Sequence, residues 1–137
     1  MRLNQISVFV ENRKGRLGEV LNVLKDAGVN ILSLSLADTA EYGLLRVIAD
    51  NPQLGKEVLS LAGFSAILSE VFVVSIPHTP GALQKILGVI AEEELSVEYM
   101  YGLSSSGSDA TVVVKTSDGE KAEEIFRKHG IRTVTSL

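Results

Sequence analysis

The chain contains no cysteine, and this absence removes several kinds of chemistry at once. Disulfide bonds, thiolate metal sites and cysteine nucleophiles are all excluded. The two histidines, His78 and His129, fall in different predicted elements and have no evident carboxylate partner, so we expect no metal site. We likewise expect no cofactor.

Long apolar runs are also missing. No run reaches the roughly 18 residues that a membrane-spanning helix requires, and residues 1–5 lack the apolar stretch and cleavage site of a signal peptide. Positive charge is not in excess either, since the net charge is −4. Neutralised phosphates supply most of the affinity for nucleic acid, so an acidic chain without a basic stripe binds it poorly. We therefore expect a cytoplasmic protein that has neither a membrane nor a nucleic acid as its partner.

What the sequence does contain is an internal repeat with a spacing of 66 residues. Gly15 corresponds to Gly81 and Val47 corresponds to Val113, without a gap in between. Such repetition means that one structural unit is present twice, and it predicts two domains over residues 1–68 and 69–137. Because a unit of this size buries only a marginal core, the two halves should pack on each other or on a second chain.

Hydrophobic periodicity predicts the same order of elements in both copies. In the first copy, strands cover residues 5–10, 31–36, 44–49 and 65–68, and helices cover 16–27 and 52–61. In the second copy, strands cover 71–76, 97–103, 110–115 and 131–134, and helices cover 82–93 and 118–129. Polar turns are expected at 38–42 and 104–108, and only Ser69 and Glu70 separate the copies. This order predicts an α+β fold of two tandem ferredoxin-like βαββαβ units, with antiparallel sheets and the helices on one face.

The turn after the first strand and the start of the next strand carry a family resemblance. The segment Val10-Glu11-Asn12-Arg13-Lys14-Gly15, followed by Gly28-Val29-Asn30-Ile31, resembles the ACT domain, an amino-acid-sensing regulatory module. Within that family it is similar to the serine-sensing domain of phosphoglycerate dehydrogenase. In the second copy, Val97-Glu98-Tyr99-Met100-Tyr101 resembles small stand-alone proteins made of two ACT domains.

The resemblance implies that Asn12 and Asn30 hold a free amino acid at the mouth of the first helix. The first copy departs from the family at Lys14, where a proline usually precedes the glycine. In the second copy His78 and Ser96 replace the two asparagines, so that site is either specialised differently or not a site. The candidate ligand contacts are Asn12, Arg13, Lys14, Gly15, Arg16, Leu17, Asn30 and Ile31 in the first copy, and His78, Pro80, Gly81, Ala82, Leu83 and Ser96 in the second.

The chemistry of these residues suits an amino acid. A helix N-terminus offers free N–H groups and partial positive charge to a carboxylate. The glycines let the backbone approach a ligand or turn with positive φ, and an asparagine side chain both accepts from an ammonium and donates to a carboxylate. Arg13 and Arg16 could pair with an anion, or lie in a solvated loop. Each residue also has a purely structural explanation, because Gly and Asn are common turn residues.

Two alternatives to a non-catalytic sensor remain open at this stage. A pair of domains that binds no ligand would serve as an assembly module. An acylphosphatase-like enzyme would use Arg13 and Arg16 to hold a phosphate, although no activated nucleophile or oriented base is evident and we expect no catalytic residue. The family resemblance also implies a homodimer, because family members extend their sheets by pairing open edges, although the two copies can instead meet that need within one chain. It implies a metabolic enzyme or regulator as a further partner.

Overall fold

The computed structural model describes residues 2–38, 41–106 and 108–137, which form two compact units. The N-terminal unit comprises Asn4–Ser69, and the C-terminal unit comprises Glu70–Leu137 together with residues 2 and 3. Each unit contains a sheet and two helices, so the predicted α+β class is confirmed.

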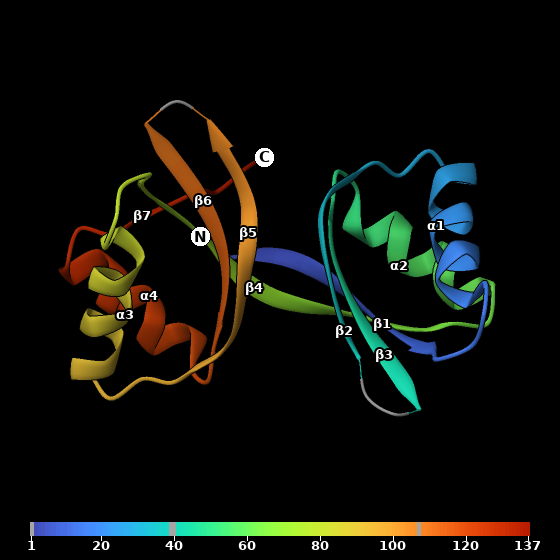
Figure 1. Cartoon of the computed structure of the whole chain (residues 1–137), viewed down its shortest axis with the longest axis horizontal. Helices are drawn as coiled ribbons and strands as arrows, with labels where there is room; N and C mark the ends of the chain where they lie inside the picture. Colours follow the sequence, from blue (N-terminus) through green and yellow to red (C-terminus); the bar gives the residue numbers. More distant parts are fainter. Residues whose placement is uncertain (1, 39–40, 107) are drawn as a thin grey trace. The chain divides into compact units, whose positions relative to one another are not determined.

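The N-terminal unit contains β1 (Leu3–Glu11), α1 (Arg16–Asp26), β2 (Ile31–Asp38), β3 (Tyr42–Ala49), α2 (Pro52–Leu61) and the first part of β4 (Ser65–Pro77). Its strands lie in the order β2-β3-β1-β4. β3 pairs antiparallel with both β1 and β2. Both helices lie on one face of this sheet, as predicted, and β2 forms its edge (Figure 1).

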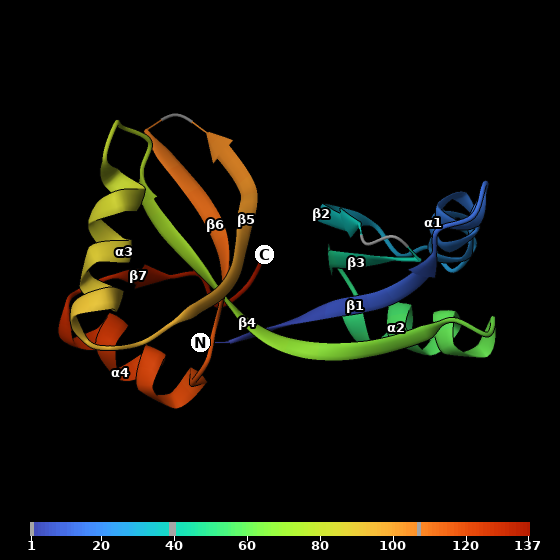
Figure 2. The same cartoon turned by 60° about the horizontal axis from the view of Figure 1, so that its bottom comes forward.

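The C-terminal unit repeats this arrangement with the rest of β4, α3 (Ala82–Glu92), β5 (Val97–Ser106), β6 (Asp109–Thr116), α4 (Gly119–Lys128) and β7 (Arg132–Thr133). The strand order is β5-β6-β4-β7, with antiparallel pairing throughout. Figure 2 shows α3 and α4 on the same side of β4 and β6. The prediction of two βαββαβ units with antiparallel sheets is therefore confirmed.

Two local features differ from the predictions, and two predicted turns include residues that the structure does not describe. β4 is one strand of 13 residues, so Ser69 and Glu70 form part of a strand and not a connector. β7 is shorter than expected, because only Arg132 and Thr133 pair with β4. The turns predicted at 38–42 and 104–108 include residues 39, 40 and 107, which lie outside the described residues.

The repeat contains an extra residue, so the gap-free correspondence of Val47 with Val113 is wrong. Ile6 pairs with Val47, whereas its counterpart Phe72 pairs with Val114. The spacing is thus 66 residues at the first strand of each unit and 67 from β6 onward. The pairing of β5 with β6 shifts between Gly102 and Ser104, a shift that β2 and β3 lack at the corresponding place. A bulge of this kind accommodates one additional residue in one strand.

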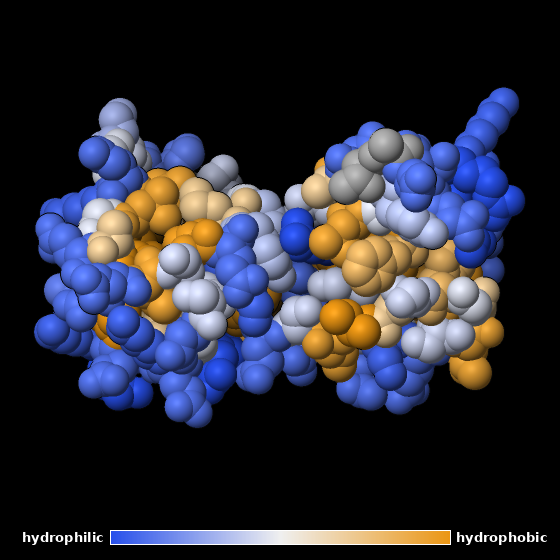
Figure 3. All heavy atoms as spheres, turned by 90° about the horizontal axis from the view of Figure 1, so that it is seen from below, coloured by the Kyte–Doolittle hydropathy of each residue, from blue (hydrophilic) through white to orange (hydrophobic). Residues whose placement is uncertain are grey.

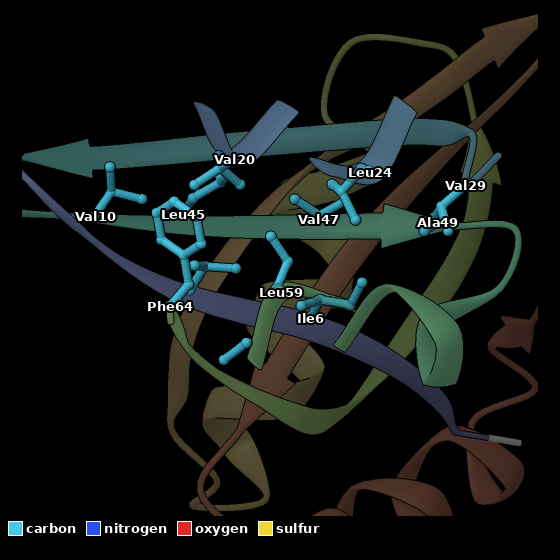
Figure 4. Close-up of a cluster of buried hydrophobic side chains, with 12 residues drawn as sticks. Ile6, Val10, Val20, Leu24, Val29, Leu45, Val47, Ala49, Leu59 and Phe64 are labelled. Atoms are coloured by element: carbon cyan, nitrogen blue, oxygen red, sulfur yellow. The ribbon is translucent and has the colours of Figure 1, made fainter. Parts of the chain in front are cut away.

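Each unit has its own hydrophobic core between its sheet and its helices. The alternating apolar residues of β1 and β3 face the apolar stripes of α1 and α2, and the side chains converge in Figure 4. In the C-terminal unit, the rings of Phe72 and Phe126 meet edge to face, with centroids 5.1 Å apart. Deeply buried residues include Ile6, Val8, Val20, Leu24, Leu45, Val47 and Leu59 in one unit, and Phe72, Val74, Ile90, Val114, Ala122 and Phe126 in the other.

Candidate functional site

The helices of each unit begin in two different ways. Asn51 and Asp118 cap α2 and α4, because each side chain accepts a hydrogen bond of 3.2 Å from a first-turn N–H. In contrast, α1 and α3 follow Gly15 and Gly81, whose φ angles are +82° and +83° and which offer no side-chain cap. The positive φ alone explains a glycine at these positions. The first turns of α1 and α3 therefore keep N–H groups without a side-chain acceptor, where an anion would be stabilised.

A cavity of about 270 Å³ opens beside the start of α1. At its border, the amide Nδ2 of Asn12 donates to Oδ1 of Asp38 over 3.3 Å. The guanidinium of Arg13 lies 3.5 Å from the carboxylate of Glu11. This cavity, called the mouth below, therefore has cationic and anionic groups at its border, which match the carboxylate and the ammonium of a zwitterionic ligand. The lining residues are Val10, Glu11, Asn12, Arg13, Leu17, Leu36, Asp38 and Gly43.

The sequence interpretation missed the contribution of β2 and β3 to this mouth. Leu36 and Asp38 lie at the end of β2, and Gly43 lies near the start of β3, so the ends of these two strands form one wall of the cavity. Asp38 belonged to a stretch predicted only as a polar turn. The signal available in the sequence was topological, because β2 runs in the same direction as β1 and must end near the turn that follows β1.

Arg16 does not line the mouth, and neither do Lys14 and Gly15. The Arg16 guanidinium carbon lies 4.1 Å from the centroid of the Phe64 ring, and its Nη1 pairs with the carboxylate of Glu19. A cation above an aromatic face and an ion pair one helical turn away together hold this side chain. Arg16 therefore fills space beside β4 and is not directed at a ligand in the mouth.

Asn30 lies at the opposite end of the sheet from Asn12. The pairing of β2 with β3 runs from Ile31 opposite Ala49 to Asp38 opposite Gly43, and Asn30 precedes that first pair. It borders a separate cavity of about 390 Å³, together with Leu21, Lys25, Gly28, Val29 and Ile31. Our expectation that Asn30 reaches the same mouth as Asn12 is wrong within one unit, because the crossover through α1 returns the chain to the starting end of β1.

The C-terminal unit has a cavity of about 530 Å³, but it opens beside β4 and β7. Pro80, Gly81 and Ala82 line it, whereas His78, Leu83 and Ser96 do not. The backbone N–H of His78 donates to the carbonyl of Ser108 over 2.7 Å, which ties the turn to the β5–β6 hairpin.

The part of the chain that the structure describes contains no group of three or more His, Asp or Glu residues that could hold a metal ion. None of its helices is long and apolar enough to cross a membrane.

Comparison with known proteins places these features in a family context. A family model described as an ACT domain pair matches residues 1–136. The structure of a protein from Bacteroides thetaiotaomicron is 34% identical, with 98% of this chain and 92% of that chain covered and a TM-score of 0.92. The ligand-free regulatory subunit of aspartate kinase from Thermus thermophilus is 21% identical over 93% of this chain and 90% of that one, with a TM-score of 0.69. At that identity the likeness shows the fold alone. No curated protein sequence matches the chain at a significant level.

Proposed function

The chain belongs to the family of ACT domain pairs, and on this premise we propose that it is a non-catalytic regulatory protein that senses a free amino acid. One observation carries the proposal, namely the mouth cavity in which Asn12 and Asp38 lie near Arg13 at the uncapped start of α1. The ammonium group of the amino acid would bind the carboxylates of Asp38 and Glu11. The carboxylate of the amino acid would accept hydrogen bonds from Arg13, from the Asn12 amide and from free N–H groups of α1.

We further propose that two chains pair through β2. This strand forms a sheet edge, and Leu32, Leu34 and Leu36 along it are 39%, 47% and 47% exposed. Apart from Leu137, every exposed large hydrophobic residue in the described ranges belongs to the N-terminal unit, whose apolar surface is visible in Figure 3. Exposed edges with apolar neighbours favour pairing with another chain.

Such a dimer would bring the two asparagines together. When a two-fold axis relates the two chains and their β2 edges pair antiparallel, the start of β2 in one chain lies beside the end of β2 in the other. Asn30 of one chain would then lie near Asp38 of the second chain, and hence near the Asn12 that Asp38 bonds. Each site would combine Asn12 from one chain with Asn30 from the other. A ligand held in this way would change the stability of the dimer, which provides a means of signalling to an enzyme or regulator.

The regulated partner would be a metabolic enzyme. The similar Thermus thermophilus structure is named as a regulatory subunit of aspartate kinase, so this fold serves there as a separate subunit beside an enzyme. The present chain would act in the same manner, with the amino acid as its signal.

The first experiment is a thermal-unfolding screen of the protein against each common amino acid. A ligand that binds only the folded state adds about 2.7 kcal/mol of stability at a hundredfold excess over its Kd. For the amino acid that raises the melting temperature, Asn12→Ala should weaken binding about tenfold to a hundredfold, because a hydrogen bond to a charged group is lost. Asn22→Ala, an exposed asparagine of α1 outside the mouth, is the matched control. Equal affinity in the Asn12→Ala protein and in the control would refute the site.

Mixed dimers test the shared site directly. Asn12→Ala and Asn30→Ala homodimers should both bind weakly, whereas a mixed dimer of the two variants contains one intact site. Calorimetric titration of the mixed sample should therefore recover tight binding at half of the sites of its mixed dimers. If each site lay within one chain, mixing would recover none.

A further inference from the structure

The large cavity of the C-terminal unit has no role in the proposed sensing site. Its volume of about 530 Å³ falls within the range of small-molecule sites, about 300–1,000 Å³. Ile76, Ile86 and Ile131 give it apolar walls, and Lys85 and Arg132 stand on two different elements at its border. The remaining lining residues are Ser75, Pro77, Thr79, Pro80, Gly81, Ala82 and Gly130.

The N-terminal unit shows how the same place is filled when no cavity is present. Phe64 and Ile131 are counterparts, because each follows a glycine of positive φ and donates its N–H back to the last turn of the preceding helix. Arg16 and Ala82 are counterparts as the first residues of α1 and α3. The stacked pair of Arg16 and Phe64 is therefore replaced by two smaller side chains, and the space that the guanidinium occupies is left open.

The two units also carry opposite charges at one corresponding position of this region. Glu19, which pairs with Arg16, corresponds to Lys85 one turn into α3. Neither Lys85 nor Arg132 makes an ion pair with any residue that the structure describes, and no carboxylate lines the cavity. One unit thus has an ion pair at this place, whereas the other has an open volume bordered by two cations that make no ion pair with the described residues.

We propose that the C-terminal unit binds a small organic anion in this cavity, with a carboxylate or phosphate head group between Lys85 and Arg132 and an apolar body against the isoleucines. A planar guanidinium matches either head group through two parallel hydrogen bonds, and the lysine adds a second charge. The site is separate from the proposed amino-acid site, since it lies in the other unit and on the β4 side of the helix.

Fluorescence of 1-anilinonaphthalene-8-sulfonate tests this site, because the probe is an anion with an apolar body. The variant Ala82→Arg/Lys85→Glu copies the filled arrangement of the N-terminal unit and should abolish the saturable emission at this cavity. Lys85→Gln and Arg132→Gln keep the cavity but remove one cation each, and each should weaken probe binding about tenfold. Arg127→Gln, an exposed arginine of α4 outside the cavity, should bind as the unchanged protein does.

Competition identifies the head group. Phenyl phosphate or benzoate should displace the probe, and the stronger competitor indicates which head group the cavity prefers. The proposal is overturned if neither displaces the probe, or if emission in the Ala82→Arg/Lys85→Glu protein equals that of the unchanged one. Asn12→Ala should leave probe binding intact, so failure of the amino-acid site and failure of this cavity are distinguishable.

Discussion

Replacing Gly15 and Gly18 by alanine, one at a time, should change stability in opposite directions. The two glycines lie three residues apart, and an added Cβ would meet no atom within 4 Å at either position. The change in contacts is therefore negligible in both cases. What differs is the backbone, because Gly15 has a φ of +82° whereas Gly18 lies inside α1.

The magnitudes follow from that difference. An L-residue in the left-handed region costs about 1–2 kcal/mol, partly offset by about 0.4–1 kcal/mol from the restricted unfolded chain. Gly15→Ala should thus destabilise the N-terminal unit by about 1 kcal/mol. Gly18→Ala removes a glycine from a helix interior and should stabilise it by about 0.5–1 kcal/mol. The two proteins should differ by about 1.5–2 kcal/mol in the free energy of unfolding.

Urea unfolding of the two variants beside the unchanged protein measures this difference. The same test can be repeated in the C-terminal unit. Gly81 has a φ of +83°, and Gly88 lies within α3 with no atom within 4 Å of an added Cβ. Gly81→Ala should destabilise and Gly88→Ala should stabilise. Equal effects at Gly15 and Gly18 would show that the turn does not require the left-handed backbone, and the structural explanation of the glycine would fail.

Two further changes test packing and charge. Gly55→Ala places a Cβ 2.6 Å from Cδ1 of Ile6, so overpacking should lower the free energy of unfolding by about 1–3 kcal/mol. Adding Ile6→Val to this variant should restore part of that loss, as a double-mutant cycle of urea unfolding would measure. Hydrogen bonds from Lys128 and His129 to Glu93 hold the pKa of that carboxyl below its usual value. Its contribution to stability is therefore present above the usual carboxyl pKa of about 4.3 and is lost as pH falls through the lowered one. Glu93→Gln should be less stable than the unchanged protein near neutral pH and equal to it in strong acid, and a constant difference at all pH values would contradict the assignment.

The fold was predictable from the sequence because its determinants are local. Alternating apolar residues in β1 and β3, helical spacing in α1 and α3, and the cap residue Asp118 each act within one turn or strand. Because of the internal repeat, each of these patterns occurs twice, and one copy supports the prediction for the other. The extra residue of β5 escaped prediction, because a bulge changes the pairing of strands without interrupting their apolar pattern.

The site was less predictable, because its residues come from segments far apart in the chain. The sequence predicts a ligand contact at the turn of Asn12. In the structure this turn lines a cavity together with Asp38 and Gly43, which reach it only once β2 and β3 are paired. Asn30 was assigned to the same mouth because it opens the neighbouring strand. Two parallel strands joined through a helix begin at the same end of the sheet, so a residue before β2 cannot meet a residue after β1 in one unit.

The divergence between the two copies follows from a few substitutions at the first turn of the first helix. In the N-terminal unit, Arg16 stacks on Phe64, so the β4 side of the start of α1 is filled and the cavity at this helix start lies on its β2 side. In the C-terminal unit, Ala82 and Ile131 leave the β4 side open, and the cavity of this unit lies there. The same backbone arrangement thus has its cavity on opposite sides of the first helix in the two copies. A duplicated unit can acquire two binding specificities in this way without any change in the order of its strands and helices.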